Sequence, residues 1–193
     1  SIKVFSLAPE LKDVIVVAID GNTHSKTEWL TSRYHDYTPS HNPKADTAIA
    51  RFFKTAVSVS GGAYDFLVTL EIQLMPLVEK TYKTNGEKGL FGHSLGGLFG
   101  SYCLIHRPDL FQKYSINSPS LWWNNGELVS QMDSLASQNL NPSRVIFLSA
   151  GKSEGNFMIS PIEGFEKSLR NKFRGIDLIY KIFDDETHLS VVP

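Results

Sequence analysis

Apolar runs of strand length alternate with longer segments of helical period along most of the chain. Five runs are mostly apolar on both faces and rich in β-branched residues, as buried parallel strands are. They span 14–19, 89–92, 114–117, 145–149 and 178–183. Three segments with apolar residues at helical spacing lie between them, at 65–82, 94–107 and 160–173. This alternation predicts an α/β fold with a mostly parallel, doubly wound sheet and helices on both faces.

Two features interrupt this alternation. Pro76 lies inside the first helical segment, where it predicts a kink or a break. Residues 21–62 are polar and punctuated by glycine and proline, with one short candidate helix around 45–57. We expect 21–62 to be an excursion over the carboxyl edge of the sheet, where such folds bind ligands. Because no repeat or second hydrophobic core is visible, we expect 1–193 to form a single domain.

Composition and charge narrow the possible classes of protein. With 41% hydrophobic residues in 193, the chain is expected to bury a sizeable core. Its formal net charge of -1, without a basic cluster interleaved with aromatics, argues against a nucleic-acid partner. The longest apolar run, 14–19, is too short to insert across a bilayer. Cys103 is the one cysteine, which excludes an intrachain disulfide and a cysteine-based metal site. Compartment and oligomeric state are left open.

A glycine-rich stretch surrounds one serine directly after the second apolar run. Residues Gly92 to Gly96, GHSLG, match G-x-S-x-G, in which the serine occupies a strained turn between a strand and a helix. The flanking positions are small because the helix and the neighbouring strand press against this turn. The pattern predicts that Ser94 is a nucleophile with an exposed hydroxyl. The alternative is a glycine-rich packing turn without chemistry.

A serine hydroxyl needs a base, and the base needs an orienting acid. His188 follows the last predicted strand, where the chain order serine, acid, histidine places the base. Glu154 lies in the turn after the fourth predicted strand and is the first candidate for the acid. Asp184 and Asp185 compete because they are close to His188 in sequence. We favour a solvated, charged turn for these two.

Further residues are candidates for contacts with the substrate. Trp122 and Trp123 follow the strand next to the nucleophile strand. We expect at least one of them to wall the acyl or alcohol pocket, the alternative being that both are core aromatics. Arg33 either forms an ion pair with Asp36 that fixes the excursion or meets an anionic substrate. His93 is expected to pack or hydrogen-bond locally, because successive side chains diverge on a tight turn.

Four blocks of sequence together resemble the putative esterase family of α/β-hydrolases. They are SRYHDYTPS (32–40), GLFGHSLGGLFGSYCLIHRPDLFQKYSINSPSLWW (89–123), VIFLSAGKSEGN (145–156) and ETHLSVVP (186–193). The family includes ferric-siderophore esterases, S-formylglutathione hydrolases, feruloyl and acetylxylan esterases, and mycolyltransferases, and the SPSLWW block is most similar to the siderophore-esterase branch. The resemblance implies Ser94 as nucleophile, His188 as base and an acid at or near Glu154. Some relatives of this branch work with a Ser–His pair alone.

The resemblance also exposes a departure at the N-terminal side. Family members carry several N-terminal strands, and a loop after one of them supplies half of the oxyanion hole through its backbone N–H. This chain enters at what resembles the next strand, 14–19. We therefore expect an excised part of a longer protein in which the Leu95 N–H is the visible oxyanion donor.

These observations predict a serine hydrolase that cleaves small-molecule carboxylic esters through an acyl-enzyme intermediate, without a metal or an organic cofactor. A thioesterase such as S-formylglutathione hydrolase, or an acyltransferase, would use the same machinery. The rival from another class is a catalytically silent α/β-hydrolase-fold module that binds ligands in a tryptophan-lined cleft.

Overall fold

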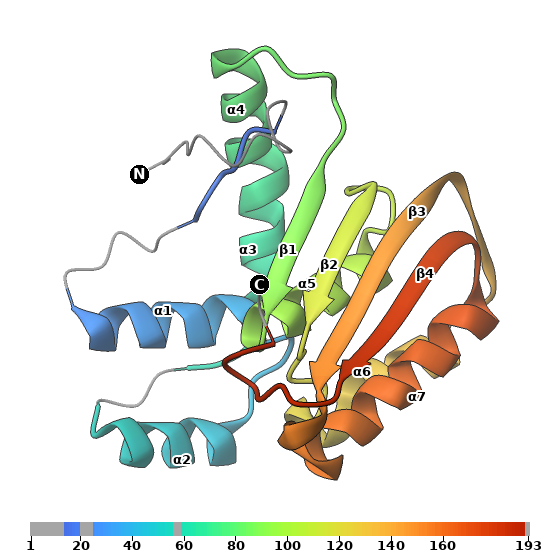
Figure 1. The fold of residues 1–193 in the computed structure, drawn as a ribbon. Coiled ribbons are helices and arrows are strands. Elements are labelled where there is room, and N and C mark those ends of the chain that lie inside the picture. The colour runs from blue at the N-terminus through green and yellow to red at the C-terminus, as the bar shows by residue number, and fades with distance from the viewer. Residues whose placement is uncertain (1–13, 20–24, 56–58, 192–193) are drawn as a thin grey trace.

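The computed structural model describes residues 14–19, 25–55 and 59–191 (Figure 1). Its four strands form one parallel sheet in the order β1-β2-β3-β4. They are β1 (Gly89–His93), β2 (Lys113–Asn117), β3 (Gln138–Gly151) and β4 (Phe173–Phe183). The four corresponding strand predictions are confirmed in place, although β3 and β4 begin earlier than expected.

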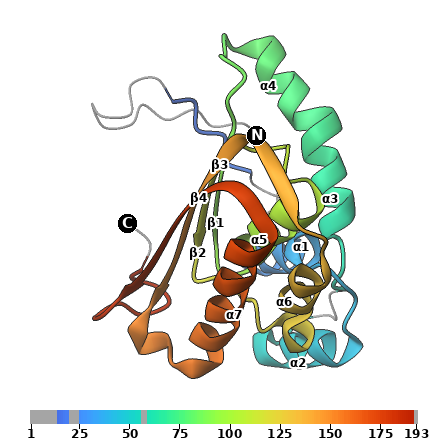
Figure 2. The same cartoon turned by 90° about the vertical axis from the view of Figure 1, so that its right-hand side faces the viewer.

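Three helices connect these strands: α5 (Leu95–His106), α6 (Trp123–Ser134) and α7 (Asn156–Lys172). The strand order follows the chain order, so right-handed crossovers place all three helices on one face of the sheet. Figure 2 shows the sheet edge-on with these helices on one side. Helices were expected on both faces, and within the described residues the second face carries none. The expected helices 94–107 and 160–173 are confirmed as α5 and α7.

The two faces of the sheet differ in burial. Tyr114 and Ile146, paired in register, are 2% and 0% exposed and form the core with the connecting helices. The next row in register crosses all four strands through Phe91, Ser115, Phe147 and Ile179. Phe91 is 60% exposed and Ile179 49% exposed. The face without described helices therefore presents apolar side chains at the surface.

The expected helix 65–82 is formed as one continuous run of three segments. They are α3 (Ala63–Thr69), the π-helix η2 (Leu70–Leu74) and α4 (Met75–Thr81). The amide of Met75 donates to the carbonyl of Leu70, five residues back. Pro76 follows directly and has no amide N–H to continue the α-helical pattern. The predicted irregularity at Pro76 is therefore a π-helical turn without a break in the helix.

The polar excursion is more regular than its sequence suggested. It contains α1 (Lys26–Tyr37), which was not predicted, and α2 (Pro43–Phe53), near the predicted helix at 45–57. The buried carboxylate of Asp46 accepts hydrogen bonds from the Tyr34 hydroxyl (2.9 Å) and the Ser60 amide (3.2 Å). Figure 1 shows α1 and α2 near the carboxyl ends of the strands, and α1 contacts α5. The excursion thus lies over the edge where a ligand was expected.

The predicted strand at 14–19 is wrong for this structure. These residues have no regular structure apart from an isolated bridge at Ala18. An apolar, β-branched run favours a strand only where a neighbour pairs its backbone and other side chains cover it. Val14 and Ile19 are 49% and 44% exposed, so this covering is incomplete.

The midchain helix α6 was also missed. Its first turn contains Asn124, Asn125 and Gly126 in left-handed conformations, so the backbone changes direction before the regular helix begins. A polar, turn-forming sequence of this kind does not predict a helix.

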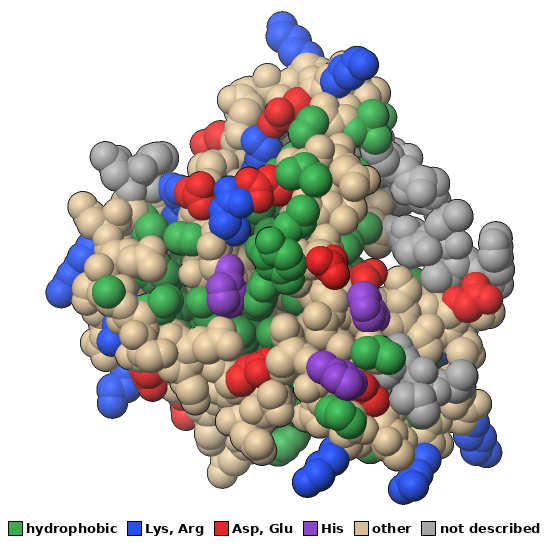
Figure 3. Space-filling model, turned by 180° about the vertical axis from the view of Figure 1, so that it is seen from behind, with side chains coloured by type: hydrophobic (Ala, Val, Ile, Leu, Met, Phe, Trp, Pro, Cys, Tyr) green, Lys and Arg blue, Asp and Glu red, His purple; other side chains and the backbone are tan. Residues whose placement is uncertain are grey.

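Seen from behind, acidic and basic side chains are interspersed over the surface, without a large region of one sign (Figure 3).

Candidate active site

The nucleophile candidate occupies a strained turn between β1 and α5. Ser94 has φ 60° and ψ -120°, values that a residue with a side chain adopts only when its surroundings impose them. The Ser94 amide donates to Asn117 O (3.1 Å), and Ser94 O accepts from the Ser120 amide (3.1 Å). A Cβ on Gly92 would lie 2.2 Å from Gly96 O. Only glycine fits at position 92 with this turn, as the motif requires.

Three predicted residues meet at the carboxyl edge of the sheet. Nε2 of His188 lies 2.9 Å from Oγ of Ser94, and Nδ1 of His188 lies 2.6 Å from Oε2 of Glu154. Glu154 ends the 3₁₀ turn η3 (Lys152–Glu154) after β3, and His188 lies in the loop after β4. The Glu154 side chain is 1% exposed and that of His188 36%. The base therefore reaches solvent while its acid is shielded.

The second oxygen of Glu154 is also held. Its Oε1 accepts from the Ser118 hydroxyl (2.5 Å) and the Gly151 amide (2.7 Å). Burial raises the pKa of Glu154, but the hydrogen bonds from Ser118, Gly151 and His188 outweigh it, so the pKa lies below its ordinary value of 4.5. Glu154 is therefore ionised at neutral pH and can stabilise an imidazolium on His188.

The competing acids lie elsewhere. Asp184 pairs with Lys152 at 2.8 Å, and both side chains are exposed. The expected solvated, charged turn is confirmed for Asp184. The backbone carbonyl of Glu186 accepts from the Ser153 amide (3.1 Å), which joins the histidine loop to the turn that carries Glu154.

The side chains of the other described histidines have partners other than the Ser94 hydroxyl. His93 points its Nε2 at the carbonyl of His188, 2.7 Å away. The rings of His35 and His41 contact the carboxylates of Asp36 and Asp46, both within the excursion. His106, at the end of α5, packs against the ring of Tyr102. Among the histidines that the structure describes, His188 alone is placed to act on the Ser94 hydroxyl.

Arg33 of α1 lies beside the strained turn at Ser94, the nucleophile elbow. Its Nη2 donates to His93 O (2.8 Å), and its guanidinium stacks on the rings of Trp29 and Tyr37. A Cβ on Gly96 would lie 3.8 Å from the same Nη2, so the cation is next to the start of α5. Burial lowers the pKa of Arg33, yet an arginine remains charged in proteins. A partly desolvated cation thus lies close to the nucleophile.

The Arg33–Asp36 ion pair is not formed. Asp36 instead accepts from the Ser32 hydroxyl (3.1 Å) and bonds to Nδ1 of His35 (2.9 Å). Both partners belong to α1, so Asp36 has a local structural role. The ion-pair alternative for Arg33 is therefore corrected.

The two tryptophans have different surroundings. Trp123 is 2% exposed and packs edge-on against Tyr34, with ring centroids 5.6 Å apart. Trp122 is half-buried and packs against Phe157, which is 68% exposed. The expectation that Trp123 contacts substrate is corrected, because its ring belongs to the core. Trp122 remains accessible to a ligand.

Two hydroxyls near the site were not found from the sequence. Ser118 holds Glu154, and Ser120 lies 3.5 Å from Ser94, oxygen to oxygen. Both belong to the SPS triplet directly after β2, at the edge where the strand ends converge. This position could have indicated from the sequence that both serines lie near the site, because residues at the carboxyl ends of adjacent parallel strands come together.

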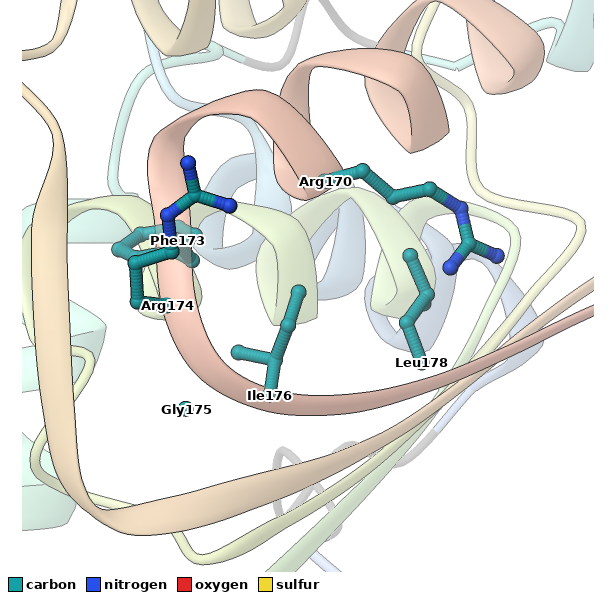
Figure 4. A pocket seen from close by; sticks show the side chains of 6 residues that line it. All are labelled: Arg170, Phe173, Arg174, Gly175, Ile176 and Leu178. Carbon is teal, nitrogen blue, oxygen red and sulfur yellow. The ribbon is translucent and has the colours of Figure 1, made fainter.

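A separate cavity of about 310 Å³ lies at the amino end of β4 (Figure 4). It is lined by Arg170, Phe173, Arg174, Gly175, Ile176 and Leu178. Ser94, His188 and Glu154 lie at the opposite, carboxyl ends of the strands, so this cavity plays no part in the candidate site.

Within residues 14–19, 25–55 and 59–191, no group of three or more His, Cys, Asp or Glu side chains is arranged to hold a metal ion. The helices of the same residues include none long and apolar enough to cross a membrane.

The chain is similar to known esterases. A family model described as "Putative esterase" matches residues 8–175. The chain belongs to this esterase family. The fold prediction, an α/β-hydrolase fold, is confirmed by similarity to solved hydrolase structures.

Individual relatives extend this result. Ferri-bacillibactin esterase BesA of Bacillus subtilis is 30% identical over 203 residues, which cover 100% of this chain and 69% of BesA. The crystal structure of the BES protein from Bacillus cereus matches with a TM-score of 0.70 and 27% identity, over 92% of this chain and 63% of that one. The enterobactin hydrolase IroE in complex with DFP matches with a TM-score of 0.69 and 27% identity, over 96% and 71%. The chain thus spans about two thirds of the length of these relatives.

Proposed function

We propose that the chain carries the active site of a serine hydrolase that cleaves carboxylic esters through an acyl-enzyme intermediate. One observation carries the proposal: two hydrogen bonds, referred to together as the relay, link Ser94 Oγ through both ring nitrogens of His188 to the buried carboxylate of Glu154. The relay begins on the strained elbow that exposes the nucleophile. Membership in the esterase family supports the same chemistry.

In the acylation step, Nε2 of His188 takes the proton of the Ser94 hydroxyl as Oγ attacks the ester carbonyl carbon. The imidazolium that forms is stabilised by the carboxylate of Glu154 on Nδ1. His188 then gives the proton to the departing alcohol oxygen, and the acyl group remains on Ser94. Deacylation repeats the sequence with water as nucleophile and releases the carboxylic acid.

The negative charge that develops on the carbonyl oxygen requires hydrogen-bond donors. The amide of Leu95, the first residue of α5, lies at a helix N-terminus, where backbone N–H groups lack intrahelical partners. We assign this amide as one donor of the oxyanion hole. In a well-studied protease, loss of one such donor raises the barrier by about 2.7–4 kcal/mol.

The names of two relatives support a proposal for the substrate class. BesA and IroE are named for the hydrolysis of ferri-bacillibactin and enterobactin, and we propose a small-molecule siderophore ester for this chain. Trp122 with Phe157 would offer an aromatic wall to such a substrate, and Arg33 would bind an anionic part of it. Thioester hydrolysis and acyl transfer have no specific observation in their favour.

The experiment is hydrolysis of p-nitrophenyl acetate and butyrate by the wild-type chain, beside Ser94→Ala and His188→Ala. We expect turnover by the wild type and a loss of roughly a thousandfold or more in kcat in each variant. His41→Ala is the matched histidine control, because His41 bonds to Asp46 away from Ser94. A folded wild type without turnover would favour the silent binding module instead.

A further inference from the structure

The imidazole of His93 joins the end of β1 to the loop that carries His188. Nε2 of His93 lies 2.7 Å from the main-chain oxygen of His188, and the two ring centroids are 4.7 Å apart. A carbonyl oxygen only accepts hydrogen bonds, so the proton must reside on Nε2 of His93. This ring nitrogen is therefore committed to the backbone of His188 and is not free to act as a base.

The charge state of His93 follows from its surroundings. Burial lowers the pKa of His93, and the neighbouring His188 and Arg33 lower it further. The hydrogen bond to His188 O and the Glu154 carboxylate act in the opposite direction, but the net pKa lies below the ordinary value of 6.5. At neutral pH the ring is thus uncharged with one proton, the form that donates through Nε2.

This hydrogen bond spans the described sheet. His93 ends β1, and His188 follows β4, and these two strands are the opposite edges in the order β1-β2-β3-β4. Other backbone bonds of the histidine loop are local, such as Val191 N to Thr187 O, or reach the adjacent turn at Ser153. The ring of His93 therefore fixes the loop that carries His188 relative to β1, the nucleophile strand. Among the described residues, the backbone hydrogen bonds of the loop do not connect it to this strand.

The position of the His188 main chain controls both bonds of its side chain. The imidazole must meet Ser94 Oγ at 2.9 Å and Glu154 Oε2 at 2.6 Å at once, so a displaced backbone lengthens at least one of them. A misplacement of about 1 Å costs on the order of a hundredfold in rate. His93 is itself anchored, because its carbonyl accepts from Arg33 Nη2 at 2.8 Å.

We propose that His93 is a positioning residue for the base, and that its Nε2-protonated ring sets where the His188 main chain lies relative to Ser94. This role deepens the proposed function and rests on it for its effect on rate. The role requires a hydrogen-bond donor at the position of Nε2. A side chain that only filled the space beside the elbow would not need this donor.

The kinetic test compares His93→Leu, which removes the donor, with His93→Gln, whose side-chain amide keeps a donor near the position of Nε2. We expect His93→Leu to lower kcat for p-nitrophenyl butyrate by roughly 10- to 100-fold, with KM changed by less than about twofold because no substrate contact is lost. His93→Gln should recover most of kcat. His106→Leu is the control for replacing a histidine of the same region, because His106 is exposed at the far end of α5 from Ser94.

A second readout does not depend on turnover. The short bond between His188 Nδ1 and Glu154 should give a downfield proton resonance in NMR spectra, assigned by its absence in His188→Ala. We expect the resonance in wild type, His93→Gln and His106→Leu, and its loss or broadening in a folded His93→Leu. A sharp, unshifted resonance in His93→Leu, or equal losses of kcat in the Leu and Gln variants, would overturn the proposal. An inactive wild type whose resonance still depends on His93 would refute the proposed function alone.

Discussion

The carboxylate of Glu154 lies 2.6 Å from Nδ1 of His188, although the two residues are 34 positions apart in the chain. Asp184 is only four positions away, yet it pairs with Lys152 at the surface. The reason is topological: β3 and β4 are adjacent and parallel, so the turns at their carboxyl ends face each other across the edge. The acid of the relay is therefore supplied by the neighbouring strand.

Replacement of that acid should slow catalysis strongly. Glu154→Gln keeps the shape but removes the charge that stabilises the imidazolium, and we expect kcat to fall by roughly a thousandfold or more. Asp184→Asn, the matched carboxylate control, should retain activity within about twofold. Steady-state kinetics with p-nitrophenyl butyrate measures both. A mild effect of Glu154→Gln would mean that a Ser–His pair suffices.

Ser118→Ala should weaken the fold in a manner that depends on pH. The pKa of Glu154 is lowered in the folded protein, so its ionised form contributes stability that is present above about pH 4.5 and is lost as pH falls through the folded pKa. Without the Ser118 hydroxyl, the folded pKa rises toward its ordinary value. The difference in free energy of unfolding between wild type and variant should thus be largest near pH 7 and shrink near pH 3.

Urea denaturation at the two pH values measures this difference. Ser134→Ala is the control, because the exposed Ser134 hydroxyl bonds only to carbonyls of its own helix in the described structure. A Ser118→Ala effect that stays constant between the two pH values would show that the hydroxyl acts independently of the Glu154 charge.

Gly92→Ala should disturb the elbow. The added Cβ would lie 2.2 Å from Gly96 O, a backbone atom that moves only with the turn. We expect a loss of about 1–3 kcal/mol in the free energy of unfolding and a large loss of kcat. Gly89→Ala lies in the same strand, where the nearest atoms would be 3.7 Å away, and should be tolerated. Equal stability of the two variants would contradict the packing explanation for the motif glycine.

The adjacent tryptophans should separate stability from substrate binding. Trp123→Ala opens a cavity in the core and should cost about 3–5 kcal/mol in the free energy of unfolding. Trp122→Ala should cost much less and should raise KM for p-nitrophenyl esters with an aromatic acyl group more than for p-nitrophenyl acetate. Thermal unfolding together with KM for both ester types tests the assignment, which a reversed pattern would refute.

The sequence was most informative where local chemistry and chain order act together. Ser94 and His188 follow from a turn motif and from their order, and Glu154 from its place after the adjacent strand. The contacts of Ser118 and His93 could not be predicted from the sequence. The contact of Ser118 with Glu154 depends on a positive φ of 40° at Ser118. The contact of His93 with His188 depends on how the sheet brings the ends of β1 and β4 together, across the three strand pairs β1–β2, β2–β3 and β3–β4. Similarly, the apolar pattern of 14–19 specifies a preference for strand but contains no information about which neighbour would pair with it.

The most direct test of the serine-hydrolase assignment is covalent labelling of the wild-type chain with a fluorophosphonate, followed by mass spectrometry of its peptides. An activated Ser94 should acquire one phosphonyl group, with no label in Ser94→Ala and much slower labelling in His188→Ala, because the base must take the hydroxyl proton. Labelling of another residue, no labelling of a folded wild type, or an equal rate in His188→Ala would contradict the relay from Ser94 through His188 to Glu154.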